Sequence, residues 1–195
     1  MTARAFILSG LAILAAAWAG PLPRLVPTSF AAHMSLHMLV VGIGMPIFAA
    51  GLAMILRHRF MRVPVLYPII ASMIDFAVIW VWHAPALHMA SRLSPMVLTL
   101  EQACFAGAAL LVWLVALTGP PLAGALELFF TSMHMVLLGA LMTLVPRALY
   151  ADICGPGTLA DQQLGGAIML TIGGVVYLGG GLMLIGRVLR PVARI

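Results

Sequence analysis

The stretch AHMSLHMLVVGIGMPIFAAGLAMIL, residues 32–56, decides the fold of this chain. It contains no Asp, Glu, Lys or Arg, and it exceeds the roughly 20 apolar residues that a helix needs to cross the hydrocarbon core of a bilayer. Backbone amides inside a bilayer must find partners within their own segment, so we expect a transmembrane helix here. Its only ionisable side chains are His33 and His37, close to its start.

The remainder of the chain has the same character. Hydrophobic residues make up 64% of it and charged residues 8%, which is too little polar surface to cover a protein in water. We therefore expect an all-α, polytopic integral membrane protein that forms a single transmembrane domain over residues 1–195. About six membrane-spanning helices are predicted, over residues 5–20, 32–56, 65–84, 96–118, 123–146 and 164–187.

The basic residues, all of them arginine, predict the orientation. If both termini are cytoplasmic, seven arginines lie inside and three outside, which satisfies the positive-inside bias. Nothing arranges them as a stripe, so we expect contacts with the lipid bilayer and no nucleic-acid partner. The inner set is Arg4, Arg57, Arg59, Arg62, Arg187, Arg190 and Arg194, and the outer set is Arg24, Arg92 and Arg147.

Histidine is followed directly by methionine at four places, although six His and 14 Met in 195 residues predict fewer than one such pair. Imidazole and thioether are ligands that suit monovalent copper. His33 and His37 are four residues apart, so a helix places both on one face, within reach of one ion. The four pairs are His33-Met34, His37-Met38, His88-Met89 and His134-Met135.

Three further histidines extend this candidate site. His83 ends the third predicted helix at the same outer level, just before Pro85, which should end or kink the helix. His88 then falls in an outer loop or a re-entrant turn, and His134 lies deeper, in the fifth helix. The alternatives are an interhelical hydrogen bond for each histidine and packing for each methionine. The predicted metal ligands are His33, His37, His83, His88, His134, Met34, Met38 and Met89.

Four polar residues could support these ligands. Asp75 lies two turns below His83, where it could orient a histidine, hold a proton or bond a neighbouring helix. Glu101 and Gln102 open the fourth helix at the outer level. Asp161 opens the sixth helix and is also typical of an N-terminal cap. Patterns of catalytic triads, phosphate loops and paired carboxylates are lacking, so we do not expect an enzyme.

Several stretches resemble the CtaG-type assembly factors of caa-type cytochrome c oxidase. They are His33-Met34-Ser35-Leu36-His37-Met38-Leu39 with Pro46, then Trp82-His83-Ala84-Pro85, then Leu159-Ala160-Asp161-Gln162-Gln163-Leu164-Gly165-Gly166-Ala167-Ile168-Met169. The aspartate-Gln-Gln-Leu-Gly-Gly run is the most specific. The chain departs from the family pattern at Gln102, where a histidine is common.

The resemblance implies a chaperone in the bacterial cytoplasmic membrane that binds copper, as Cu(I), on the periplasmic side. His33, His37 and His83 are the matching positions. Its implied partners are the catalytic subunit of cytochrome c oxidase and a periplasmic copper donor. Two alternatives remain open: a haem b electron carrier with two axial histidines, and a structural oxidase subunit without metal.

Overall fold

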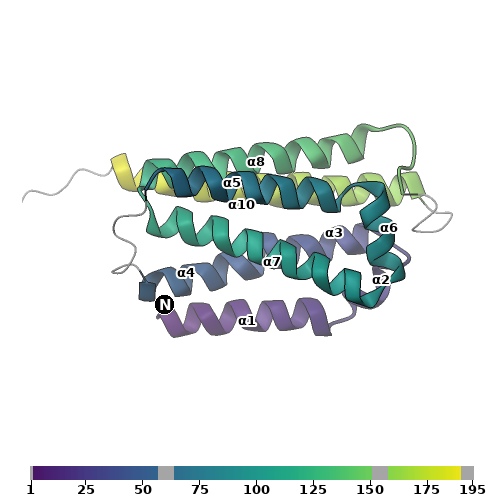
Figure 1. Cartoon of the computed structure of the whole chain (residues 1–195), viewed down its shortest axis with the longest axis horizontal. Helices are drawn as coiled ribbons and strands as arrows, with labels where there is room; N and C mark the ends of the chain where they lie inside the picture. The colour runs from purple at the N-terminus through teal and green to yellow at the C-terminus, as the bar shows by residue number, and fades with distance from the viewer. Residues whose placement is uncertain (1, 57–63, 151–157, 190–195) are drawn as a thin grey trace, which may run out of the picture.

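The computed structural model describes residues 2–56, 64–150 and 158–189, and within these residues the chain is helical with no strand. Figure 1 shows the long helices running side by side along one common axis. The all-α prediction is therefore confirmed. The helices are α1 (Ala3–Ala19), α2 (Leu22–Leu25), α3 (Phe30–Met38), the π-helix η1 (Leu39–Gly44), α4 (Met45–Leu56), α5 (Leu66–Trp82), α6 (Pro85–Leu93), α7 (Pro95–Thr118), α8 (Pro121–Leu144) and α10 (Thr158–Leu189).

Five helical segments among the described residues are long and apolar enough to cross a membrane, and there are six if one bent pair of helices is counted as a single span. The pair is α5 with α6, which meet at an angle of 71°. Large apolar side chains cover much of the outside of the bundle, as expected for a surface in contact with lipid. The chain is thus a multi-pass membrane protein. The five segments are Ala3–Leu25, Phe30–Leu56, Pro95–Thr118, Pro121–Leu144 and Leu159–Leu189.

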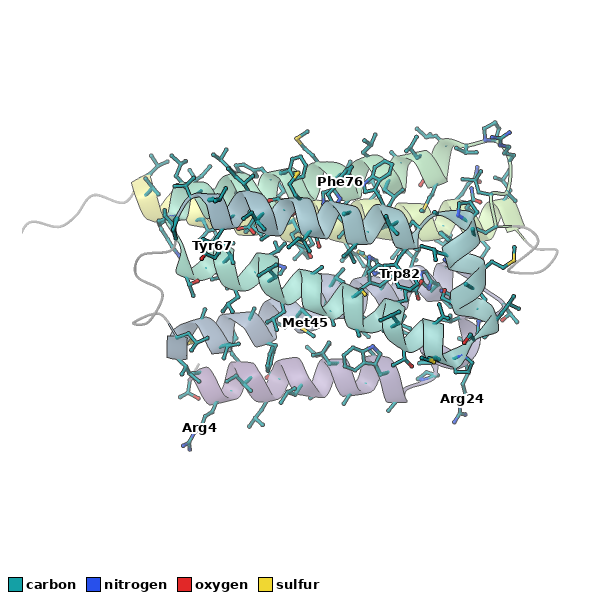
Figure 2. All side chains as sticks on the ribbon, in the orientation of Figure 1. Arg4, Arg24, Met45, Tyr67, Phe76 and Trp82 are labelled. Carbon is teal, nitrogen blue, oxygen red and sulfur yellow. The ribbon has the colours of Figure 1, made fainter. Side chains whose placement is uncertain are left out.

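The start of α1 and the end of α10 lie at the same end of the bundle (Figure 1). Figure 2 places Arg4 at that end and Arg24 at the opposite one. This arrangement agrees with both termini being on one side of the membrane. That this side is the cytoplasm stays a prediction, and five of the seven arginines assigned to it fall outside the described residues.

A π-helical segment, η1, interrupts the helix that was expected to run unbroken through residues 32–56. Pro46 explains the interruption, because proline has no N–H and its ring clashes with the carbonyl one turn earlier. The wider turn pairs the Met45 N–H with the Val40 carbonyl, five residues back. The corresponding donor for the Val41 carbonyl would be Pro46, and the Tyr177 hydroxyl from α10 donates to that carbonyl instead, at 3.1 Å.

Glycines allow α10 to lie directly against its neighbours. A Cβ atom on Gly166 would lie 2.6 Å from the Thr143 hydroxyl and 2.7 Å from the Gly139 carbonyl on α8. On Gly165 it would lie 2.5 Å from the Phe30 ring of α3. Small residues of this kind bring helix backbones together in membranes. The resulting contacts hold the start of α3 against α10, at the end of the bundle where the candidate site lies.

Candidate metal centre

Four histidines from three helical elements form one buried cluster. His33 and His37 lie one turn apart on α3, His83 caps the end of α5, and His88 lies in the middle of α6. The centroids of the His33 and His88 rings are 4.7 Å apart, and those of His37 and His83 are 5.3 Å apart. None of the four is more than 4% exposed. Residues separated by up to 55 positions in the sequence thus share one site.

The bend between α5 and α6 produces this arrangement. Pro85 is the first residue of α6, and the chain turns by 71° there, as its sequence position predicted. The expectation of a loop or re-entrant turn for His88 is corrected in one respect, because Pro85–Leu93 is a short helix. The ring of His88 is fully buried, whereas the side chain of the next residue, Met89, is 40% exposed.

The nitrogen atoms of His83 have distinct roles. Its Nδ1 lies 2.6 Å from the Ile79 carbonyl, which can only accept, so Nδ1 carries the proton. Nε2 is therefore the atom with the free lone pair, and it is buried without a hydrogen-bond partner among the described residues. The Tyr150 hydroxyl donates to the His83 carbonyl at 2.7 Å and fixes the backbone at the bend. The surroundings of His83 thus leave the lone pair of Nε2 free to bind a metal ion.

Six imidazole nitrogens of the cluster are buried without a hydrogen-bond partner in the part of the chain that the structure describes. Buried polar atoms are normally paired, so each such atom requires an explanation. Imidazole nitrogens are common ligands of copper and zinc, and a bound ion would satisfy several of these atoms at once. The atoms are His33 Nε2, His37 Nδ1 and Nε2, His83 Nε2, and His88 Nδ1 and Nε2.

Glu101 of α7 adds a carboxylate to the cluster. One ligand atom from each of His33, His88 and Glu101 lies within 4.8 Å of the other two. The Ser91 hydroxyl donates to Glu101 Oε1 at 3.1 Å, and Arg92 forms a 3.5 Å ion pair with Oε2. Glu101 was predicted only as a supporting residue. The structure places it where it could bind an ion directly.

Aromatic rings surround the histidines. Phe105 packs against His37 with ring centroids 4.2 Å apart, and Phe30 lies 5.4 Å from His88. Tyr150 stacks on Phe30 and also lies 4.6 Å from His88. The sequence analysis did not select these residues, since an aromatic residue in an apolar helix carries no signal of its own. They exclude water and hold the imidazole rings in place.

Arg92 was also missed as part of the site, because it was counted only as an outer arginine. Its guanidinium hydrogen-bonds to His33 Nδ1 and pairs with Glu101, and its side chain is 3% exposed. Arg92 follows His88 by four residues, so both project from one face of α6. The signal was present in this spacing, but it becomes informative only once residues 85–93 are known to be helical.

The predicted methionine ligands are less closely tied to the cluster. Met34 is fully buried, but its side chain packs against Gly165 of α10. Met38 is fully buried as well, whereas Met89 is largely exposed on α6. The imidazoles and Glu101 are the candidate ligands for which distances are known, and the roles of the buried Met34 and Met38 as ligands stay predictions.

His134 lies apart from the other four histidines. Its Nε2 is 3.1 Å from Asp75 Oδ2, and both side chains are buried between α8 and α5. Its ring packs against Phe76 and Phe130. Asp75 does contact a histidine, as one reading of the sequence suggested, but that histidine is His134 and not His83. The structure thus does not bring His134 into the four-histidine cluster.

Gln102 and Asp161 contact other parts of the bundle. Trp18 of α1 donates to Gln102 Oε1 at 3.2 Å. The Asp161 carboxylate accepts from the Ser29 hydroxyl at 2.8 Å and from the Phe30 N–H at 2.5 Å. Asp161 was expected to cap its own helix, α10, but its carboxylate binds the start of α3, where Ser29 is the N-cap residue. It acts on the site by fixing the helix that carries His33 and His37.

Taken together, these observations define a polytopic helical membrane protein with a buried histidine and carboxylate centre near one end of its bundle. The chain belongs to the family described as cytochrome c oxidase caa3 assembly factor (Caa3_CtaG), whose sequence model matches residues 2–191. The resemblance seen in the sequence is therefore confirmed over nearly the whole chain. Neither a curated protein nor a solved structure gives a significant match.

Proposed function

We propose that this protein binds monovalent copper at the cluster of His33, His37, His83 and His88 and passes it to cytochrome c oxidase during assembly. The observation that carries the proposal is the gathering of six unpartnered imidazole nitrogens, within the described residues, at one buried place. The family supplies the biological setting, because its members are assembly factors of this oxidase. The protein would act as a chaperone without turning over a substrate.

The geometry suits transfer better than permanent storage. His33 and His37 project from α3, while His83 and His88 lie on either side of the bend between α5 and α6, so the ligand set depends on the relative position of three elements. A site of this kind can lose a ligand through a small helix movement, whereas a structural metal site is a closed set of four fixed ligands. We propose that copper enters from a periplasmic donor and leaves toward the catalytic subunit of the oxidase, in the bacterial cytoplasmic membrane.

The test is a titration of the detergent-purified protein with Cu(I) against a competing chromophoric chelator. Wild type should bind copper, and the His33→Ala/His37→Ala double variant should lose that binding. His134→Ala is the matched control, since it removes a buried histidine that lies outside the cluster. Equal binding by wild type and the double variant would show that copper does not bind at His33 and His37. A visible spectrum of the same samples tests the haem b alternative.

A second measurement tests whether the copper site is needed for oxidase assembly in the cell. In a strain without the chromosomal copy, wild type should restore oxidase activity and the copper content of the oxidase, while the double variant should not. Full restoration by a double variant that no longer binds copper would support the alternative of a structural subunit.

A further inference from the structure

The four-histidine cluster already contains a cation, the guanidinium of Arg92. The Arg92 side chain is 3% exposed, and its Nη2 hydrogen-bonds to His33 Nδ1 and lies 3.5 Å from Glu101 Oε2. Those two residues, with His88, are the ones whose ligand atoms come within 4.8 Å of one another. The guanidinium thus contacts two of the three residues that could hold an ion together.

The hydrogen bond to His33 has a direct chemical consequence. A guanidinium only donates, so His33 Nδ1 must be the acceptor, and its lone pair is engaged by Arg92. A neutral imidazole has one free lone pair, so Nε2 of His33 carries the proton while Nδ1 accepts from Arg92, and no lone pair remains for a metal ion. Arg92 and a metal ion therefore compete for His33, and they also compete for the single negative charge of Glu101.

Electrostatics makes this competition strong. Two positive charges a few ångströms apart repel one another far more in a buried site than in water, so the guanidinium beside Glu101 opposes the binding of a metal ion there. A metal ion and the guanidinium cannot both occupy this place without a large penalty. Replacement of the guanidinium by one monovalent ion, in contrast, leaves the charge beside Glu101 unchanged.

We infer that Arg92 is a resident cation of the site, which monovalent copper must displace from His33 and Glu101 in order to bind. The inference rests on the proposed function and adds an exchange step to it. Arg92 lies near the end of α6, and its long side chain can swing away from His33 while His88, four residues earlier on the same helix, stays in the cluster. Arg92 then lowers the affinity for copper and provides the means of release, because its return expels the ion.

The experiment compares Cu(I) affinities of wild type, Arg92→Gln and Arg92→Lys in the same chelator competition. Arg92→Gln removes the competing charge, and its affinity should rise by at least about tenfold, as expected when a closed state that excludes the ligand is lost. Arg92→Lys keeps a cation and should stay close to wild type. Arg24→Gln is the matched control, since Arg24 is an exposed arginine on α2 and should leave the affinity unchanged.

Two results would overturn the inference, and they can be told apart. If wild type binds copper and Arg92→Gln binds it no more tightly, Arg92 does not compete, although the proposed copper site stands. If neither wild type nor any variant binds Cu(I), the proposed function and the exchange step both fail.

A measurement on the wild-type protein avoids reliance on a variant that could misfold. Ag(I) serves as a redox-stable monovalent probe, and phenylglyoxal labels accessible arginines, which mass spectrometry then maps. Labelling of Arg92 should increase when Ag(I) is bound, while labelling of the exposed Arg24 should not change. Unchanged labelling of Arg92 with Ag(I) bound would contradict its displacement.

Discussion

The hydroxyl of Tyr177 donates to the carbonyl of Val41 at 3.1 Å, which joins α10 to the π-helical segment just below the histidines. Pro46 occupies the position whose N–H would otherwise complete that turn. Tyr177 is fully buried, so no lipid or solvent group can take over its role. Tyr177 therefore supplies the hydrogen bond that the irregular turn of η1 lacks within its own helix.

Tyr177→Phe should therefore destabilise the protein while preserving its packing. The ring and its contact with Trp113 remain, but the Val41 carbonyl loses its donor, which costs about 1–3 kcal/mol for a buried group. Thermal unfolding of the purified protein in detergent should show the loss as a lower midpoint. Tyr67→Phe is the control, because Tyr67 is 54% exposed. Equal midpoints for Tyr177→Phe and wild type would mean that the Val41 carbonyl needs no donor.

Asp161→Ala should weaken the start of α3 and, through it, the metal centre. The substitution removes the acceptor for the Ser29 hydroxyl and the Phe30 N–H, and leaving such groups without a partner inside a protein costs about 1–3 kcal/mol. We expect a lower unfolding midpoint together with weaker Cu(I) binding. Gln163→Ala, two residues further along α10, tests whether any change at this place has the same effect. An unaltered copper affinity in Asp161→Ala would show that the contacts of Asp161 with α3 do not affect the metal centre.

Gly166→Ala should destabilise the contact between α8 and α10. The added methyl group would overlap the Gly139 carbonyl and the Thr143 hydroxyl, and overpacking of this kind costs about 1–3 kcal/mol. Gly179→Ala on the same helix is the matched control, since a Cβ there meets nothing within 4 Å. Because alanine is the better helix former, the control should be neutral or slightly more stable. Similar midpoints for the two variants would argue against close helix contact at Gly166.

Much of the fold could be predicted from composition and hydrophobic length alone, because the bilayer leaves helices as the main way to satisfy the backbone. The bend after His83 was also predictable, since Pro85 has a strong local effect. A break near Pro46 could also be predicted, but the partner of the carbonyl that it leaves could not, because Tyr177 comes from a helix more than a hundred positions away. Single-helix patterns carry no information about such a partner.

The candidate site was likewise predictable only in part from the sequence. The spacing of His33 and His37 indicated a shared face, and the position of His83 indicated a shared level. The roles of Arg92, Asp161 and His134 depend on which helices become neighbours, and apolar helices do not reveal this. Asp161 illustrates the point: its place at the start of α10 suggested a cap for that helix, whereas the close approach of α10 to α3 lets it accept from Ser29 and Phe30 of the neighbouring helix.

The pair formed by His134 and Asp75 leads to the last prediction. Both side chains are buried in the bundle, and Asp75 has His134 as its hydrogen-bonding partner at 3.1 Å. His134→Ala leaves the Asp75 carboxyl without this partner, and breaking a buried pair in this way costs about 3–5 kcal/mol. The variant should show a markedly lower unfolding midpoint but an unchanged Cu(I) affinity.

The double variant Asp75→Asn/His134→Ala separates the charge from the contact. If the penalty comes from an unpartnered buried carboxyl, replacing that group by a neutral amide should recover part of the stability lost in His134→Ala, giving a favourable coupling energy between the two sites. If the double variant is as unstable as the sum of the single variants, the two side chains act independently. If His134→Ala loses copper binding while its fold stays intact, His134 is a ligand after all. The copper site would then extend beyond the histidines of α3, α5 and α6.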